Sequence, residues 1–295
     1  MNLNQFPLWT ALVTPLLANG EVDFPSLSNL VKMQVEAKNG LLILGSTGEA
    51  LNLNLKTRKS IIEYVVNMNP ASPIMVGVGG NLLEEQKEWI SYLEGLAVQA
   101  YLLVTPHYAK PGPEGQYHWF KALMDCATRP CMLYNVPGRT AVAMSTEAVK
   151  KLSSHQNFWA IKEASGSVEK FKEYLAASGG KGVYCGDDAL LPEFTQAGSV
   201  GLVSVASNAW PQETHLYVKQ CLEKTFDAKE LWTKASNSLF VCSNPTPVKS
   251  LMHELGFITT ALMVPPLSQL DMISTQPILE AHQAVKSWFK KETNR

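Results

Sequence analysis

The sequence predicts an α/β protein: a closed barrel of eight parallel strands, each followed by a helix, with further helices at the C-terminus. Two observations predict this fold. Eight short runs are continuously apolar and end in polar residues, glycine or proline, which is typical of parallel strands covered on both faces. Segments with apolar residues at helical spacing lie between these runs. Strands that alternate with helices through right-handed crossovers leave few topologies besides this barrel.

The strand runs and the helical segments alternate along the first two thirds of the chain. The expected strands lie in residues 8–15, 40–49, 73–81, 100–108, 130–139, 158–166, 182–188 and 200–208. Helical spacing is clear in residues 25–39, 55–69, 83–99 and 117–128. An open doubly wound sheet is the competing topology. It normally carries a glycine-rich turn after its first strand, and residues 13–24 contain no such turn.

Beyond residue 210 the strand pattern stops and helical patterns continue. They occupy residues 212–226, 228–242, 246–256 and 277–292. We therefore expect a (β/α)8 TIM barrel over residues 1–225 and a C-terminal helical domain over residues 226–295.

The composition is that of a soluble globular protein with a large core, because 46% of the 295 residues are hydrophobic and 17% are charged. The net charge is -1, from 25 basic and 26 acidic residues, without a basic block. Nucleic acid is therefore not an expected partner. The N-terminus lacks the features of a signal peptide, and no apolar run reaches the ~18 residues of a membrane span, so we expect a cytoplasmic protein without membrane contact.

The five cysteines are odd in number and show no C-x-x-C spacing. This pattern argues against both a disulfide framework and a structural zinc site. We expect reduced and mostly buried thiols.

Polar side chains follow five of the predicted strands, at the end of the barrel where active sites lie. They are Ser46, Thr47 and Glu49 after the second strand, His107 and Tyr108 after the fourth, Tyr134 and Arg139 at the fifth, Lys162 at the end of the sixth, and Gly186, Asp187 and Asp188 after the seventh. Because the carboxyl ends of the strands converge, these residues can share one pocket.

Lys162 is the most informative of them, because it closes a buried strand. Removal from water lowers the pKa of an amine, and a neutral amine attacks carbonyl carbons. Lowering a lysine pKa of ~10.4 by about three would raise the neutral fraction at pH 7 about a thousandfold, at a cost of about 4 kcal/mol. The alternatives are a phosphate-binding lysine or an ion pair with Glu163, whose side chain should point the other way along a strand.

Tyr134, Thr47 and Tyr108 supply hydroxyl groups for such chemistry. Imine formation adds and removes protons at one carbon, and a phenol on the neighbouring strand can shuttle them. The hydroxyls of Thr47 and Tyr108 could connect that phenol to bulk water. The alternative for Tyr134 is a packed ring with one satisfied hydroxyl.

Arg139 suggests a substrate with a carboxylate. It lies in NVPGRT, a turn that leaves the guanidinium able to face the pocket, and guanidinium groups bind carboxylates bidentately. The alternative is a surface salt bridge. The backbone and hydroxyls of GSTGE at residues 45–49 also suit a carboxylate or a phosphate.

No metal is expected. The adjacent Asp187 and Asp188 resemble a divalent metal site, but such aspartates usually cap the next helix, here within residues 189–198. The six histidines show no H-x-x-x-H or H-x-x-E spacing.

Several motifs together resemble the dihydrodipicolinate synthase / N-acetylneuraminate lyase superfamily over essentially the whole chain. They are GSTGE at 45–49, TPHYAKPGPEGQYHWF at 105–120, YNVPGRT at 134–140, IKEASG at 161–166, GDD at 186–188 and NPTPVKSLM at 244–252. The resemblance implies a pyruvate-dependent class I aldolase reaction, and hence a lyase that works through a covalent Schiff base and needs no separate cofactor.

The resemblance also implies roles for individual residues. Lys162 matches the imine-forming lysine, and Tyr134, Thr47 and Tyr108 match the proton-relay hydroxyls. Ser46 and Thr47 would hold the pyruvate carboxylate. Gly186 and Val203 would line the pyruvate pocket. In this family Tyr108 reaches into the site of a neighbouring chain, so the resemblance implies a homo-oligomer, most often a tetramer built as a dimer of dimers.

The second substrate depends on Arg139. Members that condense pyruvate with L-aspartate 4-semialdehyde, in lysine and diaminopimelate biosynthesis, resemble this chain in carrying that arginine, whereas sialic acid lyases typically lack it. GSTGE is the form more usual in the lyases, and Gly138 replaces a common serine. The alternatives are therefore an N-acetylneuraminate lyase or a 2-keto-3-deoxy sugar acid aldolase of the same superfamily, and, from another class, a non-catalytic pyruvate-binding barrel.

Some members are inhibited by L-lysine. Asn81 and Glu85 match that allosteric site, but His107 stands where an aromatic hydroxyl is common. We therefore expect weak or absent inhibition.

Overall fold

The computed structural model describes residues 2–294. Its eight strands pair in sequence order as a closed barrel. The pairings of β1 with β2 and of the neighbouring strands from β3 to β8 are parallel. The strands are β1 (Leu8–Ala11), β2 (Gly40–Ile43), β3 (Ile74–Val78), β4 (Ala100–Val104), β5 (Cys131–Asn135), β6 (Phe158–Glu163), β7 (Gly182–Cys185) and β8 (Leu202–Ser204). The predicted barrel and all eight predicted strands are confirmed.

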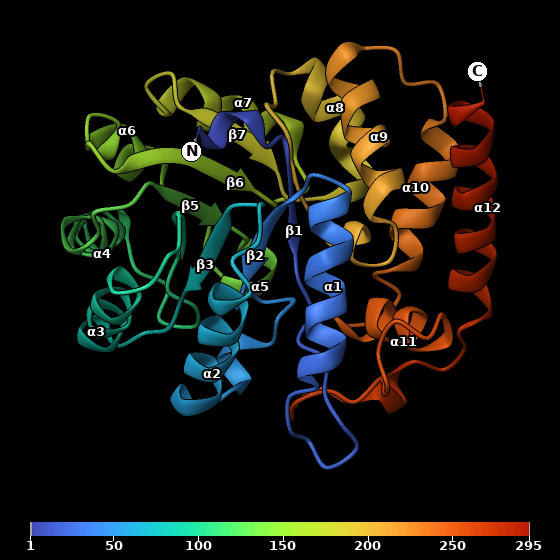
Figure 1. The fold of residues 1–295 in the computed structure, drawn as a ribbon. Helices are drawn as coiled ribbons and strands as arrows, with labels where there is room; N and C mark the ends of the chain where they lie inside the picture. The colour runs from blue at the N-terminus through green and yellow to red at the C-terminus, as the bar shows by residue number, and fades with distance from the viewer. Residues whose placement is uncertain (1, 295) are drawn as a thin grey trace. The chain divides into compact units, whose positions relative to one another are not determined.

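The chain divides into two compact units, Pro73–Val203 and Asn2–Ser72 with the chain from Ser204 onward. The first unit holds β3 to β7 and the helices that follow them. Its helices are α3 (Leu83–Glu94), α4 (Pro113–Cys126), α5 (Pro137–Thr140), α6 (Thr146–Leu152), α7 (Val168–Ala177) and α8 (Leu191–Gln196), with the 3₁₀ turn η3 (Asp188–Leu190). The helices α3, α4 and α6 lie outside the strands (Figure 1).

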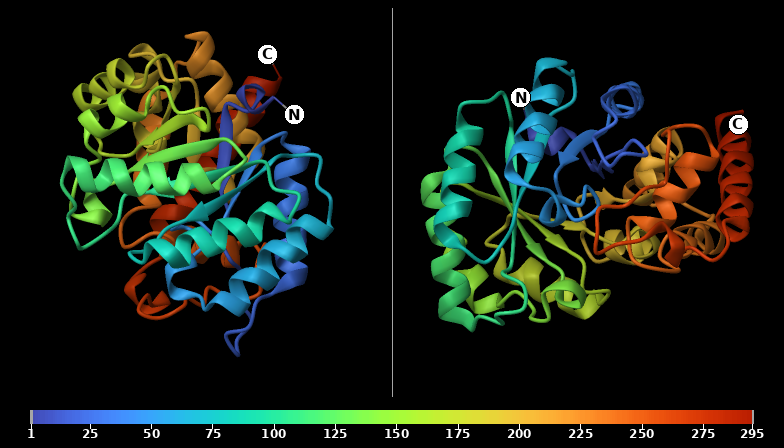
Figure 2. Two further views of the ribbon diagram at one scale, coloured as in Figure 1. Left: turned by 90° about the vertical axis from the view of Figure 1, so that its left-hand side faces the viewer. Right: turned by 90° about the horizontal axis from the view of Figure 1, so that it is seen from below.

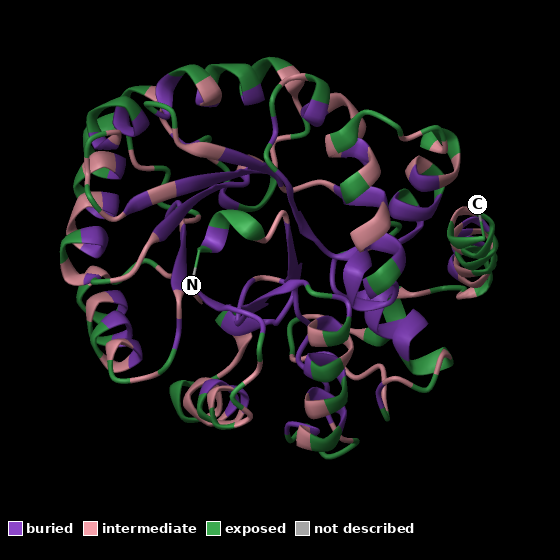
Figure 3. Ribbon diagram, turned by 45° about the horizontal axis from the view of Figure 1, so that its top comes forward, coloured by how far each residue is buried: buried purple, intermediate pink, exposed green. Residues whose placement is uncertain are grey.

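The helices of this unit turn their apolar faces towards the strands, as Figure 3 shows by burial. In α3, for example, the buried residues are Trp89, Ile90 and Leu93, at helical spacing, together with Gln86. The strands are buried along nearly their whole length. This burial on both faces explains why the strand sequences are continuously apolar rather than alternating between apolar and polar residues.

The second unit holds β1, β2, the two helices that follow them, and the four helices that come after the last strand. Its helices are α1 (Phe24–Glu36), α2 (Leu55–Asn67), α9 (Pro211–Glu223), α10 (Lys229–Ser238), α11 (Thr246–Glu254) and α12 (Gln276–Thr293), with 3₁₀ turns η1 (Leu3–Gln5), η2 (Ala50–Asn52), η4 (Ala206–Asn208) and η5 (Gln269–Asp271). The helix α12 packs against α9 and α10 (Figure 2).

Aromatic side chains hold these C-terminal helices together. The rings of Tyr217 and Trp232 are stacked with centroids 4.1 Å apart, and Trp288 of α12 meets Trp232 edge-on at 5.3 Å. Trp232 is fully buried. Because an aromatic pair adds about 0.5–1.5 kcal/mol beyond its buried area, this cluster stabilises the packing of α9, α10 and α12.

Side-chain caps explain where several helices begin. The Asp23 carboxylate accepts a hydrogen bond from the Ser26 N–H at the start of α1, and Asn54 caps α2 through the Thr57 N–H. Such a cap is worth about 1 kcal/mol.

Two details differ from the sequence prediction. The strand β6 runs one residue past Lys162, to Glu163. The NVPGRT segment forms the one-turn helix α5 rather than an open turn, because Pro137 at its first position suits a helix start. The predicted division at residues 225 and 226 stays a prediction. None of the helices described in residues 2–294 is both long and apolar enough to cross a membrane.

Candidate active site

Lys162 and Tyr134 lie side by side on adjacent strands. The two residues are register partners on β6 and β5, and the Lys162 Nζ lies 4.3 Å from the centroid of the Tyr134 ring. Lys162 is 5% exposed and Tyr134 is 6% exposed. An amine over an aromatic face in a nearly dry setting can make a cation–π contact when charged and can attack a carbonyl when neutral.

Glu163 does not pair with this amine, because alternate residues of a strand point to opposite faces. Its Oε2 accepts a hydrogen bond of 2.6 Å from Asn135 Nδ2, and its Oε1 accepts one of 2.8 Å from the Ser165 N–H. Burial raises the pKa of the Glu163 carboxyl, although these two hydrogen bonds oppose the shift. The expectation that Glu163 points away from Lys162 is confirmed.

Gly186 is placed tightly against the Lys162 side chain. Its N–H donates to the Glu163 carbonyl at 2.8 Å. A Cβ at this position would lie 2.7 Å from Ala164 Cβ, 3.0 Å from Lys162 Cε and 3.1 Å from Glu163 O. Only glycine fits this approach without displacing a neighbour. Val203, the other residue predicted to line the pyruvate pocket, is buried in β8.

Tyr108 and Arg139 lie on segments that a backbone hydrogen bond joins. The Tyr108 N–H donates to the Thr140 carbonyl at 3.2 Å, so the loop after β4 is tied to α5. The Tyr108 side chain is 88% exposed, at a φ of 66°, and Arg139 is exposed as well. Within the unit formed by residues 73–203, neither side chain is enclosed as Lys162 is.

Asn81 and His107 are neighbours on the loops that follow β3 and β4. The Asn81 Nδ2 lies 3.4 Å from the His107 Nε2. Glu85 is exposed in the first turn of α3. Whether these residues bind L-lysine stays a prediction.

The GSTGE loop belongs to the other unit and is held by residues from the C-terminal part of the chain. Thr47 is buried, and its hydroxyl accepts a hydrogen bond of 2.9 Å from Asn244 Nδ2. A hydroxyl that accepts this bond still has its own proton to donate. Ser46 is half-buried.

A buried ion pair also fixes this loop. Glu49 adopts a left-handed φ of 57°, and its Oε1 accepts from Lys249 Nζ at 2.8 Å with both side chains fully buried. The same Nζ donates to the Thr14 carbonyl at 2.9 Å, and the Val264 N–H donates to Glu49 Oε2 at 2.6 Å. Burial lowers the pKa of Lys249, although Glu49 opposes the shift.

Sequence reasoning missed the contacts of Asn244, Lys249 and Val264 with this loop. The NPTPVKSLM segment was noted only for its family likeness. The available signal was a lysine between Val248 and Leu251 in a helix whose face is apolar, since a lysine so placed needs a buried partner.

Of the two aspartates after β7, only Asp187 acts as a cap, and it caps the turn η3 rather than the helix α8, which has no side-chain cap. Asp187 caps η3 by accepting a hydrogen bond of 3.0 Å from the Ala189 N–H. In the part of the chain that the structure describes, no three His, Cys, Asp or Glu residues are grouped as a metal site would require. The five cysteines are free thiols, three of them buried, as expected.

Comparison with known proteins gives consistent matches over nearly the whole chain. The model of the dihydrodipicolinate synthetase family matches residues 6–286. The 4-hydroxy-tetrahydrodipicolinate synthase of Francisella philomiragia is 44% identical over 284 residues, which cover 96% of each chain. The dihydrodipicolinate synthase of Acinetobacter baumannii, solved with pyruvate, is 33% identical with a TM-score of 0.87 and covers 95% of this chain and 98% of its own. The lysine-bound enzyme of Cyanidioschyzon merolae is 30% identical with a TM-score of 0.89 and covers 96% and 99%.

Proposed function

Because the chain belongs to the dihydrodipicolinate synthetase family, we propose that it is a 4-hydroxy-tetrahydrodipicolinate synthase, which condenses pyruvate with L-aspartate 4-semialdehyde in lysine and diaminopimelate biosynthesis. One observation carries the mechanism. The Lys162 amine is 5% exposed and lies 4.3 Å from the centroid of the Tyr134 ring. A lysine so placed is suited to covalent catalysis rather than to surface charge.

The reaction follows from the chemistry of that amine. Neutral Lys162 adds to the C2 carbonyl of pyruvate, and the carbinolamine loses water to give the imine. Loss of a methyl proton gives the enamine, whose carbon attacks the aldehyde of the second substrate. The hydroxyl of Tyr134, whose ring lies against the amine, passes these protons. The Schiff base takes the place of a cofactor.

The other assignments rest on the family resemblance. Thr47 and Tyr108 extend the proton relay, and Ser46 joins Thr47 in holding the pyruvate carboxylate. Gly186 and Val203 line the pyruvate pocket, where the absence of a side chain at Gly186 leaves Lys162 its room. Arg139 binds the carboxylate of the semialdehyde.

Borohydride trapping tests the mechanism. Incubation with pyruvate and borohydride should add one reduced pyruvyl group to the parent protein, located at residue 162 by mass spectrometry. Lys162→Ala should remove the adduct. Lys170→Ala is the matched control, because Lys170 lies in an exposed ion pair with Glu173, and it should trap as the parent does. An adduct on Lys162→Ala would refute the mechanism.

A coupled assay tests the second substrate. We expect turnover with L-aspartate 4-semialdehyde and none with N-acetylneuraminate or 2-keto-3-deoxy sugar acids. Arg139→Ala should raise the KM for the semialdehyde by about 10- to 150-fold, the worth of a charged hydrogen bond, while pyruvate trapping is retained. Turnover of a sugar acid in preference to the semialdehyde would overturn the assignment.

We further propose a homotetramer in which Tyr108 completes the site of a neighbouring chain. Its 88% exposure leaves the phenol available to a partner. Mixing inactive Lys162→Ala with inactive Tyr108→Phe should restore roughly a quarter of the parental activity, because half of the dimers are mixed and each has one intact site. No recovery after subunit exchange would refute the sharing of Tyr108.

We also propose that inhibition by L-lysine is weak, because His107 stands where an aromatic hydroxyl is common in members that bind L-lysine. A titration of steady-state activity should show little inhibition below millimolar L-lysine. Strong inhibition at sub-millimolar concentration would refute the proposal.

A further inference from the structure

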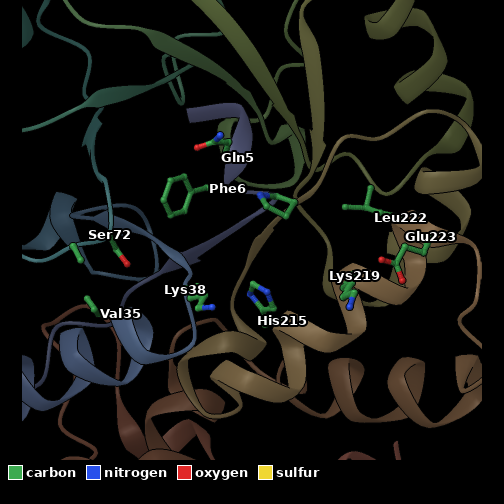
Figure 4. A pocket seen from close by; sticks show the side chains of 11 residues that line it. Gln5, Phe6, Val35, Lys38, Ser72, His215, Lys219, Leu222 and Glu223 are labelled. Atoms are coloured by element: carbon green, nitrogen blue, oxygen red, sulfur yellow. The ribbon is translucent and has the colours of Figure 1, made fainter. Parts of the chain in front are cut away.

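A pocket lies at the end of the strands β1 and β2 opposite to the GSTGE loop. It encloses about 540 Å³ and is formed by four segments of one unit: the chain before β1, the end of α1, the residues before β3, and α9. Figure 4 shows the side chains that line it. Its volume is in the range of small-molecule sites, about 300–1,000 Å³. None of the residues assigned to the proposed reaction lines it.

Most of the charged side chains that line the pocket are basic. They are Lys38, His215 and Lys219, and Glu223 is the single acidic residue among the lining residues. The His215 ring lies between the two lysine side chains in the view of Figure 4. Among the described residues neither lysine has a carboxylate within ion-pair distance. The two ammonium groups therefore create a positive potential at the imidazole.

The hydrogen bonds behind His215 determine its tautomer. The Asn39 amide nitrogen donates to Gln34 Oε1 at 2.9 Å and to the Pro211 carbonyl at 3.2 Å. Its Oδ1 therefore faces His215 Nδ1, 2.9 Å away, as an acceptor. Nδ1 must carry a proton, which leaves Nε2 as the nitrogen that can accept or donate towards a ligand.

Four apolar side chains also line the pocket: Phe6, Pro7, Val35 and Leu222. A ligand that fits both the basic and the apolar side chains has one anionic group and a compact apolar body. A bare inorganic anion would leave these apolar side chains in contact with water.

We propose that this pocket binds a small organic anion, whose carboxylate or phosphate lies among Lys38, Lys219 and His215 and whose apolar part lies against Phe6 and Leu222. The proposal does not depend on the proposed reaction. It assigns to the chain a second ligand site, remote from Lys162 in sequence and on different secondary-structure elements.

Binding should be coupled to protonation of His215. Burial, and then the charges of Lys38 and Lys219, lower the pKa of this imidazole. A bound anion offsets the two lysines and accepts a hydrogen bond from Nε2–H, so it raises that pKa. Glu223 is the remaining charged group that lines the pocket. Binding should therefore take up a proton and tighten as the pH falls, by at most about tenfold per pH unit.

Calorimetric titration with benzoate, phenylphosphate, inorganic phosphate and benzyl alcohol tests the proposal. We expect benzoate or phenylphosphate to bind, the difference identifying the headgroup, and the other two to bind at least tenfold more weakly. Lys38→Gln and Lys219→Gln should each weaken binding about two- to fivefold, the worth of one exposed ion pair. Lys32→Gln is the control, because it removes the same charge from an exposed position of α1 outside the pocket.

His215→Gln should abolish the pH dependence while its thermal transition remains cooperative. Titrations in two buffers with different ionisation enthalpies should show proton uptake by the parent and none by this variant. The proposal is overturned if neither organic anion binds at 20 mM, if Lys32→Gln weakens binding as much as Lys219→Gln, or if inorganic phosphate binds as tightly as phenylphosphate.

Discussion

Replacing Gly186 by alanine should damage catalysis through the side chain of Lys162. The added Cβ would lie 2.7 Å from Ala164 Cβ, 3.0 Å from Lys162 Cε and 3.1 Å from Glu163 O. Two of these atoms belong to or adjoin the backbone, so the flexible lysine side chain is the group that can move. Inserting a methyl group into a packed region costs about 1–3 kcal/mol.

If that cost is borne by displacing Lys162, the rate of pyruvate trapping should fall about five- to 150-fold, since 1.36 kcal/mol is tenfold in rate. The assay is the initial rate of borohydride-dependent mass increase at saturating pyruvate, alongside urea unfolding. Gly138→Ala is the matched control, because its Cβ would meet no atom within 4 Å. Its trapping rate should match that of the parent, and its stability should stay within about 0.5 kcal/mol.

The result that would refute this reasoning is a Gly186→Ala protein that traps pyruvate within twofold of the parent rate. A loss of stability with unchanged trapping would also refute it, because the strain would then lie in Ala164 or the backbone and not in the lysine.

Two further predictions concern buried charges. Lys249→Met should lower the free energy of urea unfolding by about 3–5 kcal/mol, because it leaves the Glu49 carboxylate buried without its cation. The double variant with Glu49→Gln should recover part of this loss. A double variant that is no more stable than Lys249→Met would contradict the prediction. The pKa of the Glu163 carboxyl is raised in the folded state, so the folded protein binds the carboxyl proton more tightly than the unfolded chain does. The stability contributed by this protonated carboxyl is therefore present at low pH and is lost as the pH rises from ~4.3 through the raised pKa. Glu163→Gln lacks this loss, so its unfolding free energy relative to the parent should increase between pH 4 and pH 7; a difference independent of pH would count against the shift.

The barrel could be predicted from the sequence because its signal is local. A strand buried on both faces has no polar alternation, and runs such as Ile74–Val78 and Cys131–Asn135 show this within five residues. Lys162 was recognisable for the same reason, as a charge that breaks such a run. The Asp187 cap was likewise visible, because a cap acts over two or three residues.

The features that could not be predicted depend on distant partners or on small backbone choices. Lys249 forms its ion pair with Glu49, which lies 200 positions away in the sequence, and no local sequence pattern identifies that partner. The NVPGRT segment contains both turn residues and a helix-starting proline, so its sequence is compatible with a turn and with α5. The pocket around His215 combines four segments whose lining residues look individually like ordinary surface positions.

The contacts of Asn244, Lys249 and Val264 with the GSTGE loop have a consequence for the newly made chain. The loop around Thr47 leaves the ribosome early, but the amide, the ammonium and the backbone N–H that organise it are synthesised about two hundred residues later. Until Lys249 is synthesised, the Glu49 carboxylate lacks the cation of its buried ion pair. A nascent chain that stops short of residue 264 can therefore contain Lys162 and still lack the groups that order the loop around Thr47. Synthesis of the last third of the chain is thus the step that allows the proposed active site to form.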